Sequence, residues 1–187
     1  MSQREVPATS RRYESYSHEA MKAEVESGND PAASGEIGEQ WAGLGARLRE
    51  SAQALTNIST RSEEDWKGSG GEAMRELLAA AAGWSGRATE VSFALADSVG
   101  QQAGVAARAK AEMPEPVPYD PAQLIREAAA SGKLLWLSGL ADTMAARRDE
   151  AEAARAKAVD VLNARDAALR AAAPSESFDP PPALGSS

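Results

Sequence analysis

Apolar side chains recur at helical spacing through most of the chain, and this pattern predicts long helices. Over residues 31–60 they stand three, four or seven positions apart, as on one face of an α-helix. The members of this stripe are Ile37, Trp41, Leu44, Leu48, Leu55 and Ile58. Asp30-Pro31 precedes it, and aspartate suits the N-cap while proline suits the first helical position. The pattern therefore predicts a helix over about 31–60.

A second stripe predicts another long helix, over about 70–112. Its members are Leu77, Ala81, Trp84, Ala88, Val91, Leu95, Gln102 and Val105. The two stripes are separated by Trp66-Lys67-Gly68 and two more glycines, Gly70 and Gly71, which indicate a tight turn. Two long helices joined by a tight turn form an antiparallel hairpin. We therefore expect an all-α fold, an elongated helical bundle of about five helices built on a hairpin with a Trp-x-Gly bend.

The remaining helices are predicted from residues that cap helix ends and from prolines that break helices. A short helix is predicted from Ser17 to Gly28, and alternating prolines over 113–118 stop the second long helix. Helices then follow over about 120–131 and 139–173. Residues 1–16 and the proline-rich residues 174–187 lack periodicity, so we expect disordered tails on either side of one helical domain over 17–173.

The amino-acid composition argues against some fold classes, metal sites and partner classes. Aromatic residues make up 5 % of the 187 residues, which argues against an all-β fold. The chain has no cysteine and one histidine, so we expect no disulfide, no metal centre and no cofactor. A formal net charge of −8 disfavours nucleic acid and anionic membranes as partners.

No catalytic motif is complete, so we predict a protein that is not an enzyme and takes no small-molecule substrate. His18-Glu19 matches half of a zinc-protease motif, but Lys22 stands where the second histidine belongs, and we interpret His18 as a surface residue. The glycines at 68–71 lack the lysine of a phosphate-binding loop. Adjacent carboxylates such as Glu63-Glu64 point in different directions on a helix.

Apolar surfaces that could contact a partner are better candidates for a functional site than the incomplete catalytic motifs. A two-helix layer leaves apolar surface uncovered, so we expect a partner-facing stripe. It comprises Trp41, Leu44, Leu48, Leu55, Met74, Leu77, Leu78 and Trp84. The bend motif, Trp66 and Gly68, either caps the hairpin core or joins a recognition surface. The run Leu134, Leu135, Trp136 and Leu137 is placed at a turn between helices, where it either contacts a partner or is buried locally.

The ordered set of motifs resembles the PPE family, helical substrates of the type VII (ESX) secretion systems of actinobacteria within the WXG-motif superfamily. The similar segments are Ser17 to Gly28, Trp41 to Leu48, Trp66-Lys67-Gly68 with Ala73-Met74 and Trp84, and Met113 to Pro118. The resemblance covers most of residues 17–173 and implies a PPE-like helical domain. The chain lacks the family's N-terminal Pro-Pro-Glu signature and has no Tyr-x-x-x-Asp/Glu export signal.

The resemblance also implies a function. It implies a substrate exported as a heterodimer with a small PE or WXG-type helical hairpin that carries the signal. An EspG-type chaperone would bind the tip formed by Leu134 to Leu137, and the secretion ATPase would be a further partner. No signal peptide or membrane-spanning stretch is evident, so we expect synthesis in the cytoplasm and type VII export to the cell surface or beyond. The alternative is a cytoplasmic helical scaffold that homo-oligomerises through the same stripes.

Overall fold

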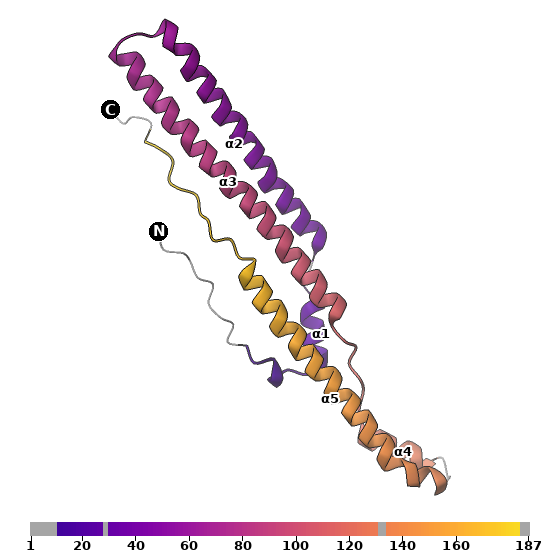
Figure 1. Cartoon of the computed structure of the whole chain (residues 1–187). Helices are drawn as coiled ribbons and strands as arrows, with labels where there is room; N and C mark the ends of the chain where they lie inside the picture. The colour runs from indigo at the N-terminus through magenta and orange to yellow at the C-terminus, as the bar shows by residue number, and fades with distance from the viewer. Residues whose placement is uncertain (1–10, 28–29, 131–133, 184–187) are drawn as a thin grey trace. The chain divides into compact units, whose positions relative to one another are not determined.

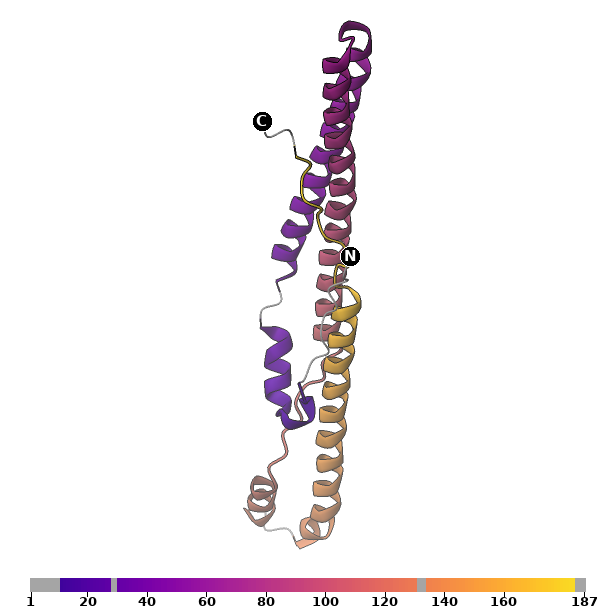
Figure 2. The same ribbon diagram turned by 90° about the vertical axis from the view of Figure 1, so that its left-hand side faces the viewer.

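The computed structural model describes residues 11–27, 30–130 and 134–183, and these ranges contain helices but no strand. The elements are η1 (Tyr13–Ser15, a 3₁₀ helix), α1 (His18–Glu26), α2 (Pro31–Asp65), α3 (Ser69–Glu112), α4 (Pro121–Ala130) and α5 (Leu134–Ala171). α2 and α3 run side by side in opposite directions (Figure 1 and Figure 2). The prediction of an all-α fold built on a long antiparallel hairpin is confirmed.

The described chain divides into two compact units. Unit 1 comprises residues 30–103 and 172–183, which are α2, most of α3 and the segment after α5. Unit 2 comprises residues 11–27, 104–130 and 134–171, which are η1, α1, the end of α3, α4 and α5. Each unit has its own set of internal contacts.

The hairpin helix α2 begins as its capping residues predict. The Asp30 carboxylate accepts hydrogen bonds from the backbone N–H groups of Ala32 and Ala33, at 3.0 and 3.1 Å. These bonds satisfy two of the four N–H groups that a helix start leaves free. Pro31 occupies the first turn, where no N–H is needed.

Glycines permit the bend between α2 and α3. Gly68 has a φ of +97°, a conformation that side-chain-bearing residues rarely adopt. Gly71 is buried against the preceding turn, and a Cβ atom there would clash with the Trp66 carbonyl oxygen. The same oxygen accepts a hydrogen bond of 2.9 Å from Arg75. The Trp-x-Gly sequence thus lets the chain reverse within three residues.

Small side chains fill the contact between α2 and α3. Gly45 lies beneath the ring of Phe93, so that a Cβ there would be 3.1 Å from the ring's Cζ atom. Ser92 is fully buried, and its hydroxyl donates to the Ala88 carbonyl at 2.7 Å, within its own helix. The absence of a side chain at Gly45 therefore makes room for the Phe93 ring of α3 against α2.

Unit 2 packs around a buried tyrosine from the stretch that the sequence predicts to be a disordered tail. Tyr13, Met21 and Val25 pack with residues of α3 and α5 in one apolar cluster. The other buried members are Ala109, Ala158, Val161 and Leu162. Tyr13 has no exposed surface. Residues 11–16 therefore belong to the fold of unit 2, whereas residues 1–10 lie outside the described ranges.

His18 is not the surface residue that the sequence predicts. Only 7 % of it is exposed, and its Nε2 lies 3.0 Å from the Pro114 carbonyl oxygen. A carbonyl only accepts hydrogen bonds, so Nε2 carries the hydrogen and donates it. Lys22 forms an ion pair with Glu115 beside it. Both contacts hold the proline-rich stretch after α3 against α1.

Two further segments differ from the sequence-based expectation. α5 begins at Leu134, before the expected start near Gly139, so the Leu134–Leu137 run lies in the first turns of a helix rather than in a turn between helices. In place of a disordered tail from residue 174, residues 174–183 form non-helical chain in contact with the hairpin. Residues 184–187 lie outside the described ranges.

Candidate partner-binding surface

The predicted partner-facing stripe lies on the two helices of the hairpin and keeps contact with solvent. Four of its members come from α2, namely Trp41, Leu44, Leu48 and Leu55, and four from α3, namely Met74, Leu77, Leu78 and Trp84. None of the eight is classed as buried, and Met74 and Leu77 are 40 % and 38 % exposed. The hairpin therefore presents apolar side chains that its own packing leaves uncovered.

Two exposed apolar residues were left out of that predicted stripe. Ile37 and Ile58, both on α2, are 46 % and 53 % exposed. They follow the same three, four and seven spacing as the stripe members, and this spacing was the signal that could have included them. Ile58 extends the apolar surface toward the bend, on the same helix as Leu55.

The bend motif leaves an indole in solvent. Trp66 is 49 % exposed, while its backbone carbonyl is held by Arg75. Half of a large aromatic surface thus remains available at the end of the hairpin, next to the first turn of α3. Aromatic side chains are enriched in protein interfaces because they bury much surface with little loss of conformational freedom. We therefore include Trp66 in the candidate surface.

The opposite end of the stripe is covered by residues that sequence reasoning missed. Phe178 stacks on Trp41, with ring centroids 6.0 Å apart and an angle of 25° between the rings. The Trp84 indole N–H donates to the backbone carbonyl of Asp179 at 2.9 Å. The run Phe-Asp-Pro-Pro-Pro gave no periodic signal, so only the folded chain reveals this contact.

Unit 2 contains a cluster of charged groups that are paired with one another. The Tyr13 hydroxyl donates to Asp166 at 2.6 Å, and Arg165 donates to that hydroxyl, to Asp166 and to Glu24 at 3.0, 2.9 and 2.7 Å. Burial, followed by the hydrogen bond to Asp166, raises the pKa of Tyr13. Burial lowers the pKa of Arg165, but hydrogen bonds to Glu24 and Asp166 outweigh it and raise the pKa overall. These charges therefore hold η1, α1 and α5 together.

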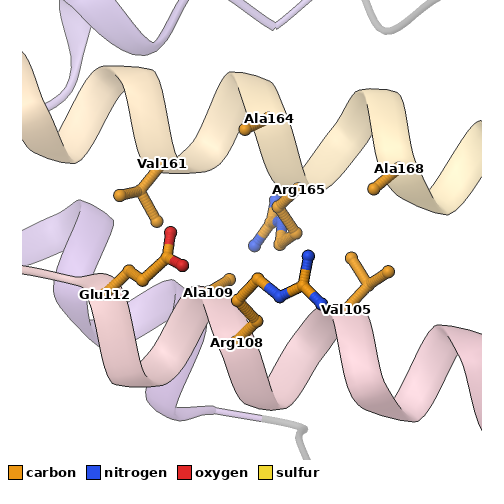
Figure 3. A pocket seen from close by; sticks show the side chains of 8 residues that line it. All are labelled: Val105, Arg108, Ala109, Glu112, Val161, Ala164, Arg165 and Ala168. Atoms are coloured by element: carbon orange, nitrogen blue, oxygen red, sulfur yellow. The ribbon is translucent and has the colours of Figure 1, made fainter.

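A small hollow lies between the end of α3 and α5, within unit 2. Figure 3 shows it lined by Val105, Arg108, Ala109 and Glu112 of α3 and by Val161, Ala164, Arg165 and Ala168 of α5. Its volume is about 80 Å³, whereas ligand pockets usually measure ~300–1,000 Å³. Arg165 is already engaged by Glu24 and Asp166. The hollow is therefore a weaker candidate than the hairpin surface.

Other sequence-based expectations are only partly covered by the structure. The side chains of Leu134, Leu135, Trp136 and Leu137 lie outside the described residues, so the predicted chaperone tip has no structural description. Among the described residues, no group of three or more His, Asp or Glu side chains is arranged to hold a metal ion. None of the described helices combines the length and apolar character that a membrane crossing requires.

Together these features define an all-helical protein whose best candidate site is an apolar surface on a long hairpin. The sequence matches no model of a known protein family and no curated protein.

Proposed function

We propose that this chain is a partner-binding protein whose hairpin receives an amphipathic helical partner. The observation that carries the proposal is the row of exposed apolar side chains near the bend of unit 1. Ile58 is 53 % exposed, Trp66 49 %, Met74 40 % and Leu77 38 %. Large apolar side chains left exposed at one end of a helical hairpin are candidates for a contact site, and we infer that a partner covers these four.

The geometry favours a helical partner over other ligands. Two antiparallel helices form a single layer, and a layer with an apolar outer face is stabilised by a second layer. A helical hairpin laid on α2 and α3 would complete a four-helix bundle with alternating ridges and grooves. Such a partner would present apolar residues at steps of three and four.

The type VII secretion setting rests on the resemblance to the PPE family. In this proposal the partner is a small PE or WXG-type helical protein, and the two chains are exported together as a non-enzymatic heterodimer. Trp41, Trp66, Gly68 and Trp84 support it, because the motifs that carry the resemblance lie on the hairpin and at its bend. An EspG-type chaperone and the secretion ATPase would act on this heterodimer before export.

The proposal is tested by co-expressing the chain with any small helical protein that a neighbouring gene encodes and measuring co-purification. We expect Ile58→Glu with Leu77→Glu to abolish the complex, because two charges would be buried in an apolar interface. Both residues are substantially exposed in the chain alone, so the helical circular dichroism should be retained.

Ile125→Glu is the matched control. Ile125 is an equally apolar residue, 52 % exposed, but it belongs to α4 in unit 2. This variant should co-purify like the unmodified chain. Co-purification of the Ile58→Glu/Leu77→Glu variant at unmodified yield would rule out the hairpin as the binding surface.

A further inference from the structure

The segment after α5 is fastened to the hairpin at its first residue. The Ala172 carbonyl oxygen accepts a hydrogen bond of 2.6 Å from the Ser98 hydroxyl and one of 3.3 Å from Gln102. Ser98 is only 7 % exposed, so this attachment is shielded from water. From Ala172 the chain runs alongside α3, where it is drawn in yellow (Figure 1 and Figure 2).

A second attachment lies six residues further on, at Phe178 and Asp179. Phe178 stacks on Trp41 of α2. Asp179 uses both of its acceptors on α3, since its backbone carbonyl receives the Trp84 indole N–H and its carboxylate pairs with Arg87 at 3.2 Å. Trp41 and Trp84 are also the predicted partner-facing residues that lie farthest from the bend along α2 and along α3, respectively.

We propose that residues 172–183 form an intramolecular strap that occupies the Trp41–Trp84 end of the partner-binding surface and is displaced when the helical partner binds. This inference rests on the proposed function, because the strap competes for the same surface. The bend end of that surface carries Ile58 and Leu77 and remains exposed, so a partner can engage there before the strap is displaced.

The strap has the properties of a weak and replaceable occupant. Phe178 remains 40 % exposed in its stack, and the side chains of Arg87 and Asp179 remain 61 % and 43 % exposed. An ion pair this exposed adds little stability and is screened by salt. The following prolines, Pro180 to Pro182, favour extended chain, so the strap covers less surface than a helix would.

The covalent connection explains how weak contacts keep the strap in place. A short tether gives a bound segment an effective concentration in the millimolar range. The attachment at Ala172 shortens the free chain further, to the few residues before Phe178. A partner present at lower concentration must therefore bind the surface more tightly than the strap does, and the strap thereby raises the affinity that a partner needs.

The first test opens the strap by substitution. The probe is the small PE or WXG-type helical protein used in the co-expression test, titrated into the full-length chain by calorimetry. We expect Phe178→Ala/Asp179→Ala to bind it roughly tenfold more tightly, because apparent affinity falls with the fraction of molecules whose surface is closed. Ser177→Ala changes an exposed residue of the same strap and should bind like the unmodified chain.

The second test closes the strap. The chain has no cysteine, so Arg87→Cys/Asp179→Cys places the only two thiols at the ion pair. A short bis-maleimide should join them and weaken binding by at least tenfold. The same variant capped on each thiol with N-ethylmaleimide is the matched reference, since its strap remains free to leave.

The outcomes distinguish a failure of the strap proposal from a failure of the proposed partner-binding function. Tighter binding by the opened variant and weaker binding by the cross-linked one support the strap. Equal binding by all variants would overturn the strap while leaving the partner-binding proposal intact. No binding by any variant, the opened one included, would overturn the proposed function and the competitive role of the strap with it.

Discussion

Tyr13 joins three elements of unit 2 through one hydroxyl group and one ring. Its hydroxyl donates to Asp166 of α5 and accepts from Arg165, which in turn pairs with Glu24 of α1. Its ring is fully buried among apolar residues. A buried phenol with a charged acceptor contributes to stability through both packing and its hydrogen bond.

We predict that Tyr13→Phe destabilises the protein by about 1–2 kcal/mol. The substitution keeps the buried ring and removes the hydrogen bond to Asp166, while Arg165 continues to pair with that carboxylate. Urea unfolding followed by circular dichroism at pH 7 measures the change. Tyr16→Phe is the matched control, because Tyr16 is 37 % exposed and neighbours Tyr13 at a ring distance of 5.8 Å.

The raised pKa of Tyr13 makes the stability difference between the unmodified chain and Tyr13→Phe depend on pH. Burial, followed by the hydrogen bond to Asp166, raises the pKa in the folded state, so the folded chain holds the phenolic proton more tightly than the unfolded chain does. The resulting stability is fully present below the ordinary tyrosine pKa of about 10 and is lost as pH rises through the folded-state pKa. The stability difference between the unmodified chain and Tyr13→Phe should shrink above about pH 10. A difference that stays constant from neutral to strongly alkaline pH would contradict this cause.

Sequence reasoning did not find this tyrosine because its partners are remote. Tyr13 and Asp166 are 153 positions apart, and Tyr13 is not part of a periodic stripe. The same is true of Phe178, whose ring partner Trp41 lies at the other end of the chain. Local patterns predict helices and their caps, whereas contacts of this kind arise only when distant segments meet.

At the scale of elements, the bend depends on two glycines with different requirements. Gly68 supplies a backbone conformation, with φ at +97°, and Gly71 supplies space beside the Trp66 carbonyl. Gly70 stands between them in the sequence and has nothing within 4 Å of its Cβ position. Neighbouring glycines of one turn therefore differ in what a substitution would cost.

We predict that Gly71→Ala destabilises unit 1 by about 1–3 kcal/mol, because the new methyl group forces the backbone at Trp66 to move. Gly70→Ala should be neutral or slightly stabilising, since alanine favours a helix by up to ~1 kcal/mol over glycine. Thermal unfolding followed by circular dichroism compares the two variants. Equal melting temperatures would show that the close contact at Gly71 does not constrain the bend.

The sequence predicted those elements that have local signals. Asp30 and Asp120 each precede a helix that begins at a proline, and both aspartates accept hydrogen bonds from first-turn N–H groups. The start of α5 was predicted too late because Gly139 and the apolar run were interpreted as a turn. A helix tolerates an interior glycine at a cost of ~1 kcal/mol, so a single glycine does not define a helix end.

At the scale of the whole molecule, the sequence predicted the fold class and the hairpin but not which parts of the surface are covered. The partner-facing stripe on α2 and α3 was predicted from the sequence, and none of its eight members is buried. The cover over Trp41 and Trp84 was not visible, because it comes from non-periodic chain after α5. A periodic stripe shows that a face is apolar, but only the folded chain shows what lies on it.

The proposed heterodimer follows from the surface that remains exposed. Ile58, Trp66, Met74 and Leu77 all lie toward the bend, and each is at least 38 % exposed. A second chain that covers them removes apolar area from water at ~25 cal/mol per Å². Self-association through the same residues is the competing way to cover this surface, and the mass of the assembled species distinguishes the two.

The most direct measurement is therefore the molar mass of the co-expressed species, by size-exclusion chromatography with light scattering. We expect a 1:1 complex, with the mass of this 19.5 kDa chain plus one copy of the small helical partner. A species that contains this chain alone, whether one copy or several, would contradict the partner-binding function. Several copies would favour the scaffold that homo-oligomerises through its own hairpin.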